Sequence, residues 1–143
     1  MNREESDLHL GFSVNMQRHQ KEQLAVLLSP LYMNLKRSEM AYRGFLSSGK
    51  LFCYAQIIFD CNTKIVDLLT TYGYLVPVEL EQDALLLLEH LDVWKMKWVD
   101  HRLKNNPSAD DLFHFENTNR FPRASAQKFE DAFHALRREY LEE

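Results

Sequence analysis

The fold class is decided by residues 77–103, PVELEQDALLLLEHLDVWKMKWVDHRL. Steps of three and four residues, the spacing that lines one face of an α-helix, separate the members of a stripe: Leu80, Ala84, Leu87, Leu91, Trp94, Trp98 and His101. Pro77 suits a first helical position, because its missing N–H would have no partner there. Glu79 and Glu81 favour the positive end of the helix dipole. We predict one helix of about 25 residues that ends near Leu103.

The same spacing recurs in three other segments. Their stripes are Leu24, Leu28, Leu31, Leu35, Ser38, Tyr42 and Phe45; Leu51, Ala55, Ile58, Asn62, Ile65, Leu69 and Tyr72; and Phe129, Ala132, Phe133, Leu136 and Tyr140. Pro30 should bend the first helix or mark a new start after Ser29, because it removes a backbone donor. Gly49 and Gly73 are suitable helix ends. The sequence therefore predicts an all-α bundle of about four main helices, the first bent at Pro30.

Residues 104–123, before the last helix, show no helical periodicity. A connection of about twenty residues is longer than usual in a compact domain. Its apolar members predict a long ordered loop that packs across the bundle: Leu112, Phe113, Phe115 and Phe121. Residues 1–13 are expected to be loosely ordered, and residues 1–143 to form a single helical domain.

Composition excludes several classes of protein. Hydrophobic residues make up 45% of the chain and charged residues 27%, as in globular domains. The longest apolar run, Leu85 to Leu88, is far shorter than the ~20 residues of a membrane span, and no signal peptide is visible. Cys53 and Cys61 lie too far apart on one predicted helix to form a disulfide. We expect a cytoplasmic protein that binds no membrane.

Motifs for cofactor or nucleotide chemistry are missing. The four glycines never cluster into a phosphate-binding loop, and no Gly-x-Ser-x-Gly elbow is present, so no cofactor is expected. A net charge of −4 disfavours nucleic acid as the main partner. The densest positive region is a candidate anion-binding surface: Arg120, Arg123, Arg137 and Arg138. The acidic residues among them make an ordinary solvated surface the alternative.

Three of the stripes contain one polar residue each: Ser38, Asn62 and His101. Buried polar groups need partners, so these residues could fix the register of the helices or line a pocket. Alternatively, they lie at stripe edges and meet water.

The helix over residues 77–103 is apolar on more than one face. We predict that a partner protein binds there and on the loop, through Trp94, Trp98, Leu86, Val93, Phe113 and Phe115. Aromatic residues spaced by four are also typical of a core, which is the alternative for Trp94 and Trp98.

An enzyme is the competing class. Helical ribonucleases of the HEPN class carry an Arg followed four to six residues later by a His. Only Arg3 to His9 fits, and chance supplies about one such pair, so no family is assigned. An RNA-cleaving or metal-dependent helical enzyme remains the alternative function, and it would use His90, His101, His114 or His134. However, the stripes of the long helices contain no Glu, which disfavours a metal site. We therefore expect a non-enzymatic protein-interaction or regulatory module that self-associates or joins a larger assembly.

Overall fold

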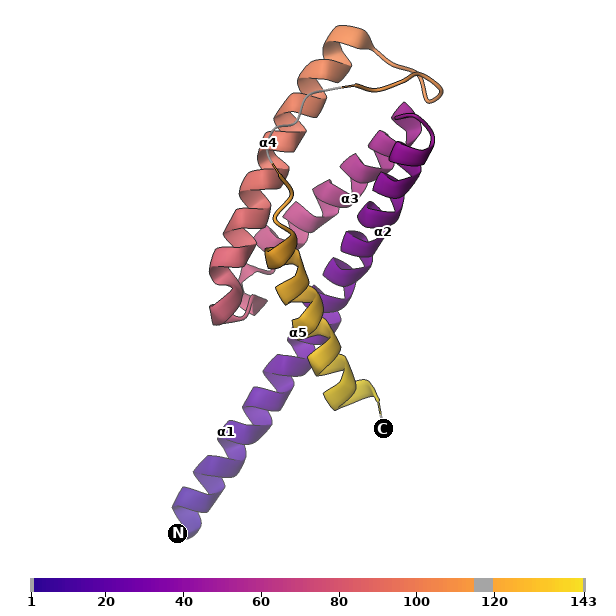
Figure 1. Ribbon diagram of the computed structural model, residues 1–143. Coiled ribbons are helices and arrows are strands. Elements are labelled where there is room, and N and C mark those ends of the chain that lie inside the picture. The colour runs from indigo at the N-terminus through magenta and orange to yellow at the C-terminus, as the bar shows by residue number, and fades with distance from the viewer. Residues whose placement is uncertain (1, 115–119, 143) are drawn as a thin grey trace.

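The computed structural model describes residues 2–114 and 120–142, and helices dominate this part of the chain (Figure 1). The elements are α1 (Arg3–Glu22), a π-helical turn (Gln23–Leu28), α2 (Ser29–Ser47), α3 (Phe52–Thr71), two 3₁₀ turns (Gly73–Leu75 and Val78–Leu80), α4 (Glu81–Asn105) and α5 (Arg123–Leu141). The predicted all-α bundle is confirmed. The predicted helix near residues 77–103 is α4, which begins after the second 3₁₀ turn.

Helices α1 and α2 follow each other through the π-helical turn without a loop (Figure 1). Pro30 lies at the start of α2, and in an α-helix its ring would clash with the carbonyl four residues earlier. The π-helical turn relieves this clash because it widens the helix by one residue: the Ser29 N–H donates to the Leu24 carbonyl, five residues earlier, instead of to the carbonyl four residues earlier. The irregularity predicted at Pro30 therefore takes the form of a π turn.

A tight turn reverses the chain between α2 and α3. Gly49 and Lys50 both have positive φ, at 76° and 74°, and the Lys50 N–H donates to the Phe45 carbonyl at 2.7 Å. The two helices then lie close together at Gly44, where a Cβ atom would overlap the ring of Tyr54. Glycine at position 44 therefore permits this close approach of α2 and α3.

The larger core cluster joins α2, α3, α4 and α5. Fully buried members include Leu27, Leu28, Leu31, Ile65, Leu75, Leu87 and Phe129. Two buried polar pairs lie within this region: Ser125 Oγ donates to Asp83 Oδ1 at 2.8 Å, and Gln23 Nε2 donates to the Leu75 carbonyl at 2.9 Å. These pairs offset the cost of removing polar atoms from water.

A second, aromatic cluster lies at the other end of the bundle. Its buried members are Ala41, Phe52, Ala55, Ile58, Trp94, Trp98 and Phe113. The loop is held there by backbone hydrogen bonds, in which the Phe113 N–H donates to the Lys50 carbonyl at 2.8 Å and the Phe52 N–H donates to the Asp111 carbonyl at 2.8 Å. The predicted packing of the loop is therefore confirmed at Phe113.

Other apolar residues of the loop do not follow that prediction. Leu112 forms an isolated bridge with Leu51, yet its side chain is 56% exposed, because neighbouring residues of an extended segment point in opposite directions. Phe121 is 40% exposed. Phe115 lies outside the described residues.

Helix α1 projects from the body of the molecule (Figure 1). Asn2 caps it: the Glu5 N–H donates to Asn2 Oδ1 at 2.9 Å, and the Asn2 N–H donates to the Glu5 carboxylate at 3.3 Å. Residues 3–13, which we expected to be loosely ordered, therefore form a capped helix. Among them, Leu8, Leu10 and Phe12 are exposed by 60% or more.

Candidate interaction surface

Three of the four aromatic residues predicted to bind a partner lie inside the protein, and the fourth, Phe115, is outside the described residues. Trp94, Trp98 and Phe113 are only 9%, 3% and 0% exposed. Phe59 stacks on Trp98 with ring centroids 4.0 Å apart, and Phe113 packs against Phe52 at 5.1 Å. Each ring is thus covered by its own chain, which corrects the expectation of a partner surface at these three positions.

Two predicted partner residues remain accessible on α4. Leu86 is 41% exposed and Val93 is half-buried. Both belong to a helix whose other side is packed in the core, so their exposure is that of ordinary surface residues.

The three polar stripe residues are not brought together at one site. Asn62 is buried on α3 and lines a small hollow between α3 and α4, whereas Ser38 and His101 are not among its lining residues. Ser38 is half-buried on α2. His101 is half-buried near the end of α4, and its ring meets the edge of Phe113 at 4.5 Å.

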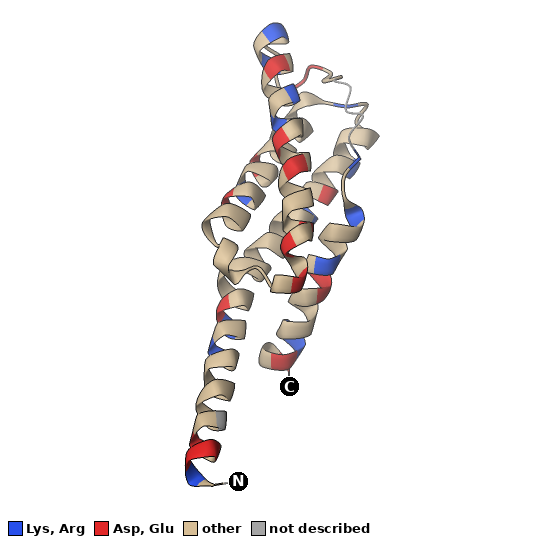
Figure 2. Cartoon of the chain, turned by 90° about the vertical axis from the view of Figure 1, so that its left-hand side faces the viewer, with Lys and Arg blue, Asp and Glu red and all other residues tan. Residues whose placement is uncertain are grey.

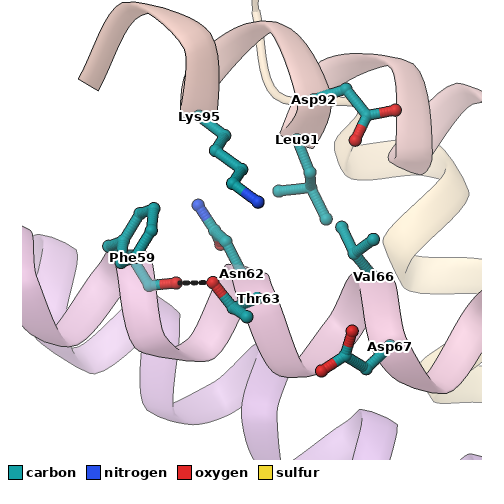
Figure 3. A pocket seen from close by; sticks show the side chains of 8 residues that line it. All are labelled: Phe59, Asn62, Thr63, Val66, Asp67, Leu91, Asp92 and Lys95. Carbon is teal, nitrogen blue, oxygen red and sulfur yellow. Dashed lines mark hydrogen bonds between the residues drawn. The ribbon is translucent and has the colours of Figure 1, made fainter. Parts of the chain in front are cut away.

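The hollow has a volume of about 60 Å³. In Figure 3 the side chains of Asn62 and Lys95 extend toward each other across it, while the carboxylate of Asp92 points away from Lys95. Small-molecule pockets usually measure about 300–1,000 Å³, so this hollow has room for only one or two waters.

The histidines are dispersed. His90 is buried on α4, and loss of hydration lowers its pKa, although a hydrogen bond with the Arg120 backbone opposes that shift. His114 is exposed in the loop, and His134 meets the edge of Tyr32 at 5.1 Å. Among the residues that the structure describes, no group of three or more His, Cys, Asp or Glu side chains could hold a metal ion.

The four arginines divide into two distant pairs, all of them exposed. Arg120 and Arg123 lie at the start of α5, and Arg137 and Arg138 lie near its end. Fourteen residues separate Arg123 from Arg137, which is about 21 Å along a helix. Arg137 Nε also lies 3.8 Å from Glu142. The structure therefore does not gather these side chains into one anion site.

The surface that the sequence analysis missed is a stripe on α1. Its members are Glu5, Leu8, Phe12, Met16 and His19, at helical steps of three and four. Leu8 is 75% exposed, Phe12 is 66% exposed and Met16 is 48% exposed. We call this the α1 stripe. The signal was hidden because apolar residues also occur at positions 10 and 14, so the segment alternates like a strand.

Charge is divided along α1 (Figure 2). Residues 3–7 carry Arg3 against Glu4, Glu5 and Asp7, a net charge of 1 − 3 = −2, and residues 18–22 carry Arg18 and Lys21 against Glu22, a net charge of 2 − 1 = +1 with His19 neutral. An acidic half therefore lies at the free end and a basic half lies next to the body.

The base of α1 is anchored to the body. The Tyr140 hydroxyl of α5 donates to Gln20, and the Lys21 ammonium lies 5.5 Å from the centroid of the Tyr140 ring. On another side, the Tyr74 hydroxyl donates to Glu22 Oε1 at 2.9 Å, and this hydrogen bond raises the pKa of Tyr74. These contacts fix the direction in which α1 leaves the bundle.

In the described part of the chain, none of the helices combines the length and apolar character needed to cross a membrane. Comparison with models of protein families, with curated proteins and with solved structures finds no match to this chain.

Proposed function

We propose that this protein is a non-enzymatic, cytoplasmic protein-interaction module that self-associates or joins a larger assembly, and that α1 is its binding element. The observation that carries the proposal is the α1 stripe, whose three apolar side chains are 48–75% exposed on a helix that projects from the body (Figure 1). Exposed apolar surface of this kind is typical of interaction sites.

The residues of α1 support a need for a partner. Isolated helices shorter than about 12–15 residues are only marginally stable in water, and the part of α1 that projects beyond its anchor at Gln20, residues 3–19, is little longer than that. Gly11, in the middle of α1, lowers helix stability by about 1 kcal/mol relative to Ala, and Val14 and Asn15 also have low helix propensity. A partner that covers the α1 stripe would stabilise the helix by removing its apolar side chains from water.

Helix α4 offers a comparison, because it also exposes apolar side chains: Met96 is 73% exposed and Leu103 is 79% exposed. Its opposite side, including Trp94 and Trp98, is packed in the core, so α4 does not need a partner to stay folded. The part of α1 beyond its base lacks that support. This contrast favours α1 as the binding element.

Site-specific photo-crosslinking tests the proposal. A photoreactive benzophenone side chain replaces Phe12, and the control variant carries it in place of Met96, which is similarly exposed on α4. After irradiation in the source cells, we expect covalent adducts from position 12 and few from position 96. Adducts at neither position, or at position 96 alone, would show that α1 is not the binding element.

A further inference from the structure

We propose that the partner of α1 is a second copy of this chain, and that the two α1 helices pair antiparallel around a two-fold axis near Phe12. This inference rests on the proposed function and names the partner for the same surface. Three features of α1 support this pairing: the symmetry of the α1 stripe, its charges and the free space around it.

The spacing of the α1 stripe is the same in both directions. Its steps from Glu5 to His19 are three, four, four and three residues, with Phe12 at the centre. An inverted copy therefore places Phe12 against Phe12 and Leu8 against Met16. A two-fold interface requires such a self-complementary surface, since each contact must occur twice.

The ends of the α1 stripe are complementary in charge. Inversion places Glu5 of one copy beside His19 of the other, and it sets the net acidic residues 3–7 of one copy level with the net basic residues 17–21 of the other. Arg3 is thereby set level with Lys21, but both lie on the side of the helix opposite Phe12. Parallel pairing would instead place acidic ends together and basic ends together. Because charges interact over about 8–10 Å at ordinary salt, the antiparallel arrangement is the favoured one.

Space is available for a second helix. Gln20 lies on the side of α1 that faces α5, where it contacts Tyr140. His19 is the preceding residue, so it lies about 100° around the helix from Gln20, and it is exposed. Gly11, beside the centre of the α1 stripe, has open space where a Cβ atom would stand.

A lipid surface is the main alternative covering for an amphipathic helix. Helices that lie on membranes are usually rich in Lys and Arg on their polar side. The free end of α1 instead carries Glu4, Glu5 and Asp7 against Arg3, a net charge of 1 − 3 = −2, which anionic lipid would repel. The charges therefore favour a second protein chain.

Cysteine cross-linking of the purified 143-residue chain tests both the partner and the orientation. Single variants Phe12→Cys, Leu8→Cys and Met16→Cys are treated with a short bis-maleimide in a Cys53→Ser background, where the remaining Cys61 is buried. We expect a covalent dimer from Phe12→Cys alone. Leu8→Cys and Met16→Cys should give it only when the two proteins are mixed.

A control variant, Val14→Cys, places the thiol on another side of the same helix and should give no dimer. Equal dimers from all three single variants would indicate parallel pairing and overturn the proposal. The absence of a covalent dimer from every variant and mixture would also overturn the proposal. So would a chain that does not cross-link but co-sediments with anionic vesicles. If the photo-crosslinker at position 12 gives adducts to other proteins in cells and no dimer forms, the proposed function stands and only the proposal of self-pairing is refuted.

Discussion

Phe113 and Leu112 form a matched pair that measures how firmly the loop is held. They are neighbours in sequence, but Phe113 is 0% exposed and Leu112 is 56% exposed. Truncation of a buried Phe to Ala typically costs about 3–5 kcal/mol, because it removes apolar contacts and leaves a cavity. For Leu112→Ala the lost groups are less than half covered, so the cost is about 1 kcal/mol.

The assay is urea unfolding followed by tryptophan fluorescence, with Trp98 as a reporter 6.4 Å from the Phe113 ring. We expect Phe113→Ala to lower the free energy of unfolding by at least about 2 kcal/mol more than Leu112→Ala does. Phe113→Leu, a milder variant, keeps the comparison measurable if the Ala variant does not fold. Equal losses for Phe113→Ala and Leu112→Ala would refute the docking of this loop into the aromatic cluster.

Three further predictions concern the body of the molecule. Gly44→Ala should lower the free energy of unfolding by about 1–3 kcal/mol, since the added methyl group collides with a ring of α3. The control Gly11→Ala meets open space and should not lower the free energy of unfolding; thermal melts compare the stabilities of the two variants. Burial lowers the pKa of His90, so the unfolded state binds more protons; the contribution of His90 to stability is present above pH ~6.5 and is lost as the pH falls through its folded pKa. Urea titrations at pH 7.5 and 5.5 should show a smaller pH effect in His90→Gln, and an unchanged effect would contradict this account. Burial raises the pKa of Cys61, so a thiol reagent should modify half-buried Cys53 first in the native protein. Mass spectrometry of partial digests can show the order of modification, and modification of Cys61 before Cys53 would be inconsistent with the fold.

Most of the fold could be predicted because helical periodicity is local information. Seven stripe members defined α4, and its observed end at Asn105 lies two residues from the predicted Leu103. The π turn could not be predicted, because Pro30 specifies an irregularity without specifying its form. The pairing of Asp83 with Ser125 joins residues 42 apart, and no local pattern encodes such a contact.

The candidate surface was harder to predict than the fold. Periodicity shows which residues share a face but does not show what covers that face, so Trp94 and Trp98 could have belonged to a core or to an interface. Their place in the core follows from Phe59, Phe52 and the loop, which meet only in three dimensions. On α1, the alternating apolar residues hid a helical stripe that becomes visible once the backbone is known to be helical.

The energy of self-pairing can be worked from the exposure of Phe12. Complete burial of a Phe side chain contributes about 1.5–3 kcal/mol, and Phe12 is 66% exposed, so covering it contributes about 1–2 kcal/mol per copy. Two copies meet at the axis, which doubles this to about 2–4 kcal/mol. Phe12→Ala should therefore raise the dissociation constant of the dimer about 30- to 1000-fold.

The most direct test of α1 as the binding element is the solution mass of the purified chain, measured by light scattering over a range of concentrations. We predict a dimer of twice the 17.0 kDa chain mass, which Phe12→Glu converts to a folded monomer and which Met96→Glu leaves intact. Circular dichroism verifies that each variant is folded. A wild-type monomer at every concentration, or a dimer that Met96→Glu dissociates and Phe12→Glu does not, would contradict self-association through α1.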